Sequence, residues 1–163
     1  VKRVSFADPL KQACKAIFPD PNINWENKDS EYLPALPRDI LLRDLMKGLG
    51  LGLRKELYED FWIDLAMITA SNFWRDGFLP VITDVRFQNE AAAIKRVGGK
   101  IIRVKRTDLQ QVFDPHPSEQ EILQIRPDLE VINDGTEKYL SVIDCLIAPL
   151  IPERFLLTDR SWM

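Results

Sequence analysis

Short apolar segments alternate with stretches of helical periodicity, and this alternation limits the fold more than any other feature of the chain. Strand patterns occupy residues 1–6, 79–83, 100–105 and 129–132. Because strands that alternate with helices usually pair in parallel, the sequence predicts an α/β fold with a mainly parallel sheet. The continuous apolar run at 79–83 is typical of a strand buried on both faces. A length of 163 residues fits one domain.

Helices are predicted between and after these strands, and turn-forming residues mark their ends. The first opens with Asp8 as N-cap and Pro9 at the first helical position. Others are predicted at residues 37–48, 58–75, 89–97, 119–125 and 136–147. The glycines at 48, 50 and 52 are expected to end the second of these helices. Gly98 and Gly99 are expected to cap the helix over 89–97.

The apolar stripe of the 58–75 helix favours a core position over a base-stacking platform. Trp62, Ala66, Ala70 and Phe73 follow at helical spacing. Cys14 and Cys145 also lie in apolar helical patterns without a CxxC pair, so both are predicted to be buried free thiols.

Charge and hydropathy exclude several classes of protein. The formal net charge of −3 argues against a general binder of nucleic-acid polymers. No run of about 18 apolar residues could span a membrane, and no secretory signal opens the chain. A cytoplasmic protein is therefore expected. With one histidine and no CxxC pair, the chain lacks the ligands of a typical protein metal site.

Polar clusters follow three of the strand patterns, where ligands of parallel sheets bind. They are residues 5–8, 84–87 and 106–108. Arg86 beside Asp84 is a candidate phosphate clamp, because a guanidinium matches phosphate oxygens bidentately, although an Asp–Arg pair can also simply tie a loop. His116 is the only histidine and lies near carboxylates in the sequence. A lone histidine in such a setting is more often structural than catalytic.

A glycine-rich phosphate loop is not present in the 163 residues. The segment Gly48-Leu49-Gly50-Leu51-Gly52 leaves a helix rather than a strand, and no Lys-Ser or Lys-Thr follows it. The pattern G-x-x-x-x-G-K-[ST] occurs nowhere else in the chain.

Several short motifs in a specific order resemble the phage deoxynucleoside monophosphate kinase family. Together they cover roughly residues 1–148. They are Phe6-Ala7-Asp8-Pro9-Leu10-Lys11, Arg43-x-Leu45-Met46-x-x-Leu49-Gly50 followed by Trp62, Asp84-Val85-Arg86-Phe87-Gln88-Asn89-Glu90, Gly98-Gly99 with the strand after it, and His116-x-Ser118-Glu119 followed by Val131-Ile132-Asn133-Asp134-Gly135-Thr136.

The resemblance implies a three-layer α/β/α P-loop kinase fold and a reaction. ATP, with Mg²⁺, would give its γ-phosphoryl group to a deoxynucleoside monophosphate and produce the diphosphate. Residues 22–78 would form a helical substrate-binding region, 106–125 a lid-like segment, and 149–163 a C-terminal tail. The substrate would be the partner, with no nucleic-acid polymer and no membrane; homo-oligomerisation is left open.

The resemblance also implies roles for particular residues. Asp84, Arg86 and Arg106 would be catalytic. The monophosphate would be held by Arg86 together with Asp8, Lys11, Arg43 and Arg54, although Arg43 and Arg54 taken alone have the pattern of solvated helix charges. Asp114, His116 and Glu119 would belong to the lid, which closes to exclude water.

Two departures from the family pattern leave alternatives open. Family members begin with a strand and a phosphate-binding loop, and this chain starts after both. Leu51 and Gly52 stand where the family usually has Thr and an acidic residue. The chain is then either a kinase whose first segment lies upstream, and inactive as these residues alone, or a non-catalytic relative that binds nucleotides or proteins. An upstream G-x-x-x-x-G-K-[ST] in the reading frame would favour the kinase.

The absent first strand raises a question about the sheet. In kinases of this kind that strand lies in the centre, and an unfilled gap would leave backbone groups unpaired at about 1–3 kcal/mol each. The favoured expectation is that residues 1–6 take the central place. The other is that a different chain or segment donates a strand.

Overall fold

The computed structural model describes residues 1–33, 39–106, 117–136 and 145–155, and of 117–120 only the backbone. The chain forms two compact units, Val1–Asp84 and Val85–Met163, and each is described here on its own. The prediction of a single domain stays a prediction.

The first unit contains a parallel pair of strands, β1 (Lys2–Val4) and β2 (Pro80–Ile82). Arg3 is in register with Val81, and Val4 is buried. The prediction that this second strand is buried on both faces is wrong, because Val81 is 41% exposed. Among the described residues β1 pairs with β2 alone. The expectation of a central place for the first strand stays a prediction.

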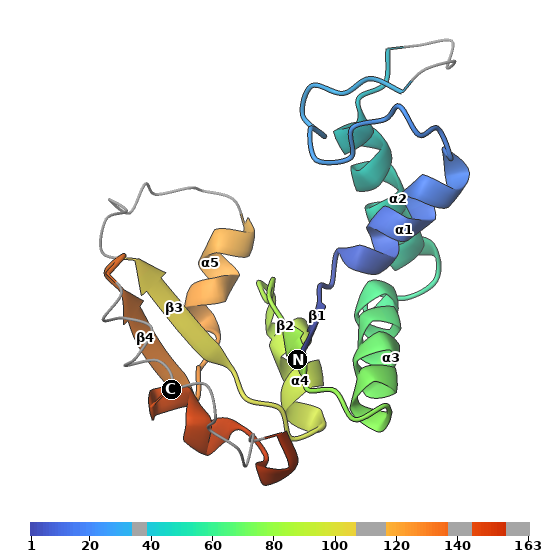
Figure 1. The fold of residues 1–163 in the computed structure, drawn as a ribbon. Helices are drawn as coiled ribbons and strands as arrows, with labels where there is room; N and C mark the ends of the chain where they lie inside the picture. The colour runs from blue at the N-terminus through green and yellow to red at the C-terminus, as the bar shows by residue number, and fades with distance from the viewer. Residues whose placement is uncertain (34–38, 107–116, 137–144, 156–163) are drawn as a thin grey trace. The chain divides into compact units, whose positions relative to one another are not determined.

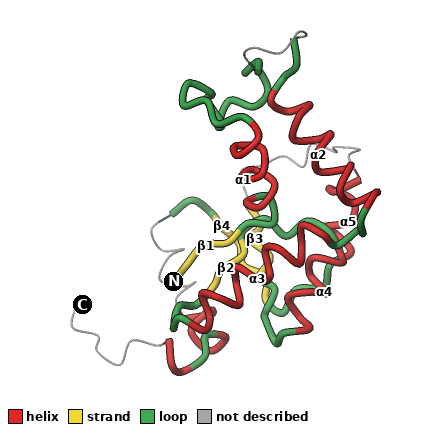
Figure 2. The backbone as a smooth tube through the Cα atoms, turned by 90° about the vertical axis from the view of Figure 1, so that its right-hand side faces the viewer, coloured by secondary structure: helices red, strands yellow, loops and turns green. Residues whose placement is uncertain are grey.

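Two of the three helices of this unit, α1 (Asp8–Ile17) and α3 (Phe61–Arg75), follow the predicted patterns closely. The first begins one residue earlier than predicted, with Ala7 rather than Asp8 at the N-cap. The core prediction for α3 is confirmed by four buried side chains, Trp62, Ile63, Ala66 and Ala70. Helix α3 contacts both strands and α1, which also contacts α2 (Figures 1 and 2).

Helix α2 (Leu42–Glu56) runs through all three glycines, so the prediction that they end a helix is wrong. A glycine in a helix costs only about 1 kcal/mol relative to alanine, and packing can offset that. Leu42 is fully buried, and the Trp62 indole Nε1–H donates to the Gly50 carbonyl oxygen at 3.0 Å. A Cβ atom on Gly50 would lie 3.2 Å from Leu10 Cδ2, so the glycine allows α1 to pack closely.

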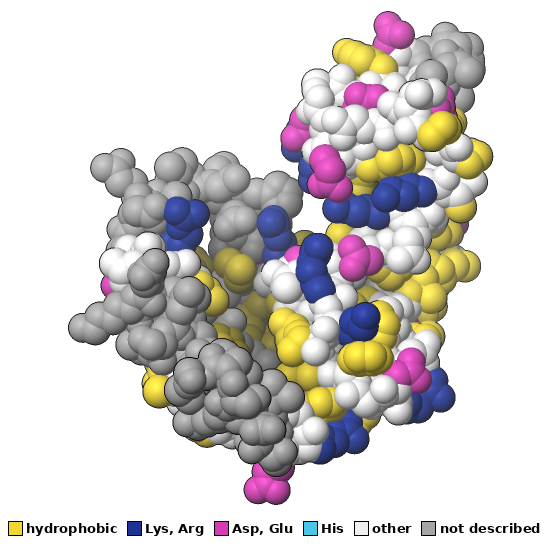
Figure 3. Space-filling view, in the orientation of Figure 1, with side chains coloured by type: hydrophobic (Ala, Val, Ile, Leu, Met, Phe, Trp, Pro, Cys, Tyr) yellow, Lys and Arg dark blue, Asp and Glu magenta, His cyan; other side chains and the backbone are white. Residues whose placement is uncertain are grey.

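The loop before α2 closes a small core of its own. Ile23, Leu33 and Leu42 are buried together. An isolated antiparallel bridge joins Tyr32, inside the loop, to Leu41, the residue just before α2. Larger apolar side chains also remain on the surface of this unit, where Figure 3 shows them in yellow among charged groups.

The second unit contains α4 (Gln88–Arg96), β3 (Ile102–Arg106), α5 (Pro117–Gln124) and β4 (Leu129–Asn133). Strands β3 and β4 are parallel, with Val104 in register with Val131. Gly98 follows α4 with φ of 81°, which confirms the predicted glycine cap. The parallel α/β class is confirmed, and the described strands form two separate two-stranded sheets.

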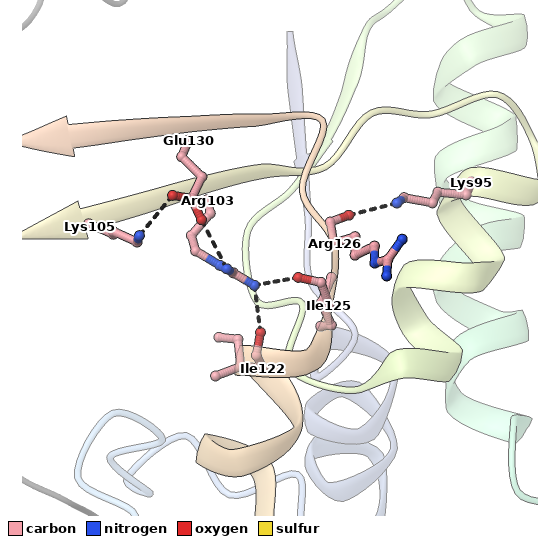
Figure 4. A network of polar contacts seen from close by, with 7 residues as sticks. All are labelled: Lys95, Arg103, Lys105, Ile122, Ile125, Arg126 and Glu130. Atoms are coloured by element: carbon pink, nitrogen blue, oxygen red, sulfur yellow. Dashed lines mark hydrogen bonds and ion pairs between the residues drawn. The ribbon is translucent and has the colours of Figure 1, made fainter.

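Arg103 of β3 fastens the end of α5 to the sheet. Its guanidinium donates to the Ile122 carbonyl oxygen at 2.8 Å and to that of Ile125, and forms an ion pair with Glu130 at 3.0 Å (Figure 4). Lys105 contacts the other oxygen of Glu130 at 2.7 Å. These contacts satisfy carbonyl groups that the C-terminus of a helix leaves without intrahelical partners.

The acid stability of this unit is expected to depend on Asp128. The backbone N–H of Ile101, at 2.9 Å, and then the Lys100 ammonium lower the pKa of this carboxyl below its ordinary value of 3.8. A lowered folded pKa contributes stability that is present above pH 3.8 and is lost as the pH falls through the folded value. Urea unfolding of Asp128→Asn should differ from wild type above that pH, and the difference should shrink below it. A difference that stays constant down to pH 2 would contradict the assignment.

The C-terminal part of the chain is described only in pieces. Most of the helix predicted over 136–147 lies outside the described residues. The tail contains two short 3-10 helices, Ala148–Leu150 and Glu153–Phe155. Cys145 is exposed, so the prediction that both thiols are buried holds only for Cys14, which is fully buried. No helix in the described ranges combines the length and the apolar character needed to cross a bilayer.

Candidate substrate site

Asp84, at the end of β2, is held by the loop that follows β1. Its Oδ2 accepts the Ser5 hydroxyl at 2.5 Å and the Ala7 backbone N–H at 3.2 Å. Its Oδ1 accepts the Phe6 backbone N–H at 2.9 Å. Parallel pairing of β1 and β2 brings the carboxyl ends of the two strands to the same edge, which is why residues 79 positions apart meet. Asp84 thus satisfies N–H groups at the start of α1.

The contacts of Asp84 limit what else it can bind. A carboxylate has about four lone-pair sites, and three are used here. The remaining one is on Oδ1, so Asp84 can take one further cation or donor but cannot chelate through both oxygens. Ser5, which is buried, also accepts the Ala7 N–H at 3.1 Å, so its hydroxyl proton is directed at Asp84.

Asp8 is fixed by the same loop. Its Oδ2 accepts the Ser5 backbone N–H at 3.0 Å, which leaves Oδ1 without a contact to the described residues. Lys11 lies one turn further along α1 and is half-buried. The structure therefore brings Asp8 and Asp84 to the same loop, as their positions after the two strands predicted.

Arg86 is an exposed residue at the start of the second unit, and a buried carboxylate shapes its backbone. Glu90 Oε2 accepts the N–H of Arg86 at 2.8 Å and that of Phe87 at 3.1 Å. Glu90 is 3% exposed. The motif around Asp84 contained Glu90, yet sequence reasoning gave it no role; a Glu three residues after an N-cap was the available signal.

Arg43 and Arg54 lie on one continuous helix, α2, because the helix does not end at the glycines between them. They are 11 residues apart, so they share one side of α2 at a separation of about three turns. Arg43 forms an exposed ion pair with Asp29 at 3.0 Å. Arg54 is half-buried.

The other side of α2 carries a groove of about 720 Å³. Apolar side chains and glycines line it, together with three carboxylates, Asp39, Asp44 and Glu56. At about 100° per residue, Arg43 and Arg54 project from the opposite side of the helix. The acidic groove would repel a phosphate, so it is not the site predicted around those arginines.

The remaining predicted residues lie in or near the second unit's less completely described part. Arg106 is the last residue of β3. Asp114 and His116 lie outside the described residues, and Glu119 lies in α5 with only its backbone described. Within the described ranges, no three His, Cys, Asp or Glu side chains come together as metal ligands.

Comparison with known proteins agrees with the motifs. A model of the family described as deoxynucleotide monophosphate kinase matches residues 23–143. A protein of Acanthamoeba polyphaga mimivirus named "Putative deoxynucleotide monophosphate kinase" is 35% identical to this chain, over an alignment that covers 87% of this chain and 81% of the viral protein. The family match spans well over half of the chain, from the loop before α2 to beyond β4. The chain belongs to the deoxynucleotide monophosphate kinase family.

Proposed function

We propose that this chain carries the acceptor side of a deoxynucleoside monophosphate kinase, which transfers the γ-phosphoryl group of ATP to the monophosphate and forms a diphosphate. Family membership supports the reaction. One observation links the reaction to particular residues: the carboxylate of Asp84 is held by hydrogen bonds at the carboxyl ends of two parallel strands. Ligands of open parallel sheets bind at that edge. A kinase of this kind would have the three-layer α/β/α P-loop fold.

In this proposal the cationic and anionic side chains have different tasks. Arg86 would contact the monophosphate, because a guanidinium can donate to two phosphate oxygens at once. Arg106, Arg43, Arg54 and Lys11 would add positive charge around the acceptor. The loop after β1 keeps Asp84 in place while phosphate charge accumulates, because the Ser5 hydroxyl and the Ala7 N–H already donate to the carboxylate.

The residues present fit a Mg²⁺ ion of the kind found in phosphoryl-transfer enzymes. Such ions use one or two carboxylates and complete their coordination with phosphate oxygens and water. Asp84 has one oxygen lone pair left for this purpose. The ion would supply neutralisation of the phosphate charge. No residue is assigned to the donor ATP, because the 163 residues contain no G-x-x-x-x-G-K-[ST] pattern.

We expect these 163 residues alone to bind a deoxynucleoside monophosphate but to have negligible kinase turnover. The backbone N–H groups and lysine of a phosphate-binding loop normally hold the donor phosphates. A coupled ADP-release assay with dGMP, dTMP and dCMP would measure the turnover. A rate in the usual kinase range of about 1–100 s⁻¹ would show that the chain holds the donor by other means. The same assay on a polypeptide that also contains a phosphate-binding loop separates the two hypotheses: a kinase should then turn over, whereas a non-catalytic relative should still show no turnover.

A further inference from the structure

We propose that a small pocket beside the Asp84 anchor receives the nucleobase of the monophosphate; this rests on the proposed function. The pocket measures about 160 Å³ and lies between β1, α1 and α3, with Arg3, Asp8, Gln12, Ala66, Thr69 and Phe73 among its lining residues. Pockets that enclose whole drug-sized ligands are typically about 300–1,000 Å³. This one can enclose a planar ring, but not a nucleotide, whose sugar and phosphate would remain outside.

Two polar side chains of the pocket, Asp8 and Arg3, are each oriented by one hydrogen bond. Asp8 is oriented by the Ser5 backbone N–H at 3.0 Å on Oδ2, which leaves Oδ1 as an acceptor. Arg3 is oriented through its Nε–H, which donates to Thr83 Oγ1 at 3.2 Å, so its two terminal NH₂ groups remain as donors. Arg3 and Asp8 form no ion pair with each other in the described part of the chain. The pocket therefore presents an acceptor on Asp8 and donors on Arg3.

A nucleobase matches that arrangement. The edges of the bases carry N–H donors next to oxygen or nitrogen acceptors. A donor on the base could pair with Asp8 and a neighbouring acceptor with Arg3, while Gln12 can supply either partner. A phosphate, by contrast, has acceptors only and would meet the carboxylate of Asp8.

The walls between these polar groups suit a flat ring. Phe73 is half-buried on α3, Ala66 is fully buried, and Pro9 closes the side formed by α1. Stacking of a base on an aromatic ring contributes about 1–3 kcal/mol and requires only an accessible face. The aromatic stripe of α3 is mainly core, and Phe73 is the member of it that borders this pocket.

The position of the pocket also fits the proposed reaction. Ser5 lines the pocket and donates its hydroxyl to Asp84 at 2.5 Å. A base in the pocket would thus lie one side chain away from the proposed catalytic carboxylate. The acidic groove on α2 has no such connection to Asp84 and contains no cation among its lining residues.

The test compares ligands with and without a base. Thr69→Leu adds bulk inside the pocket, and Ser71→Leu adds similar bulk on an exposed position of α3 outside it. Calorimetric titration would use dGMP, dTMP and 2-deoxyribose 5-phosphate. We expect Thr69→Leu to weaken both nucleotides by about tenfold or more, which corresponds to about 1.4 kcal/mol, and to leave the sugar phosphate unchanged. Ser71→Leu should bind all three as wild type does.

The outcomes separate the pocket from the proposed function. If wild type binds the nucleotides and Thr69→Leu binds them equally well, or loses all three ligands alike, the pocket does not hold the base, whereas the proposed function stands. If the folded wild type binds neither nucleotide, both proposals fail. Should Thr69→Leu not fold, Asp8→Asn replaces it: the amide oxygen can keep the Ser5 contact while an NH₂ donor replaces the acceptor in the pocket. Unchanged nucleotide affinity in Asp8→Asn would overturn the proposal.

Discussion

Replacing Asp84 with Ala is expected to lower the free energy of unfolding by about 3 kcal/mol or more. The substitution leaves three donors without their acceptor, the Ser5 hydroxyl and the backbone N–H groups of Phe6 and Ala7. Each unsatisfied group costs about 1–3 kcal/mol, with water offsetting part of the loss because the site is only partly buried. Because small domains are stable by about 5–15 kcal/mol in total, denaturant unfolding should show the change clearly.

Asp8→Ala is the matched control for this prediction. Asp8, the first residue of α1, contacts the same loop but accepts only one backbone N–H, that of Ser5, so its removal should cost about 1 kcal/mol. Equal unfolding midpoints for the two variants would show that Asp84 does not anchor the loop. The comparison matters for function, since a large stability effect at Asp84 must be separated from any loss of activity.

The second large effect is expected at Gly99, where alanine should destabilise the protein by about 1–3 kcal/mol through overpacking. A Cβ atom there would lie 2.5 Å from Ile94 Cγ2 and 3.0 Å from the Ile94 carbonyl oxygen. Ile94 is buried on α4, so neither atom can move freely. Thermal unfolding would measure the shift.

Gly48→Ala is the control, and its effect on stability should have the opposite sign. Gly48 lies inside α2, and a Cβ atom there would meet nothing within 4 Å. Alanine should therefore stabilise the helix by about 0.5–1 kcal/mol. If Gly48→Ala is destabilising by a similar amount to Gly99→Ala, α2 does not continue through its glycines.

Periodicity in the sequence was enough to predict most helices and strands, but not the length of α2. Three glycines at alternate positions indicate a break when only local preference is weighed. The helix continues because Leu42 is fully buried, Gly50 accepts the Trp62 indole N–H, and the small glycine lets Leu10 approach. These are tertiary contacts, and no local pattern contains them.

The outline of the candidate site was predictable from the sequence, but the contacts within it were not. The rule that ligands bind at strand ends singled out both Asp8 and Asp84. Ser5 directs its hydroxyl at Asp84, 79 residues away, because β1 pairs with β2, and the sequence does not specify this pairing locally. Likewise, the part that Glu90 takes in shaping the Arg86 backbone depends on its burial, which an isolated glutamate does not reveal.

A calorimetric titration of the folded chain with dGMP, dTMP and dCMP shows whether the acceptor side binds a monophosphate, and it does not require turnover. We expect saturable binding of at least one of them. We also expect Arg86→Ala to weaken this binding by about 1.5–3 kcal/mol, the value of a hydrogen bond to a charged group. Arg96→Ala, an exposed arginine at the end of α4, should bind as wild type does. Folded protein that binds none of the three nucleotides would contradict the account.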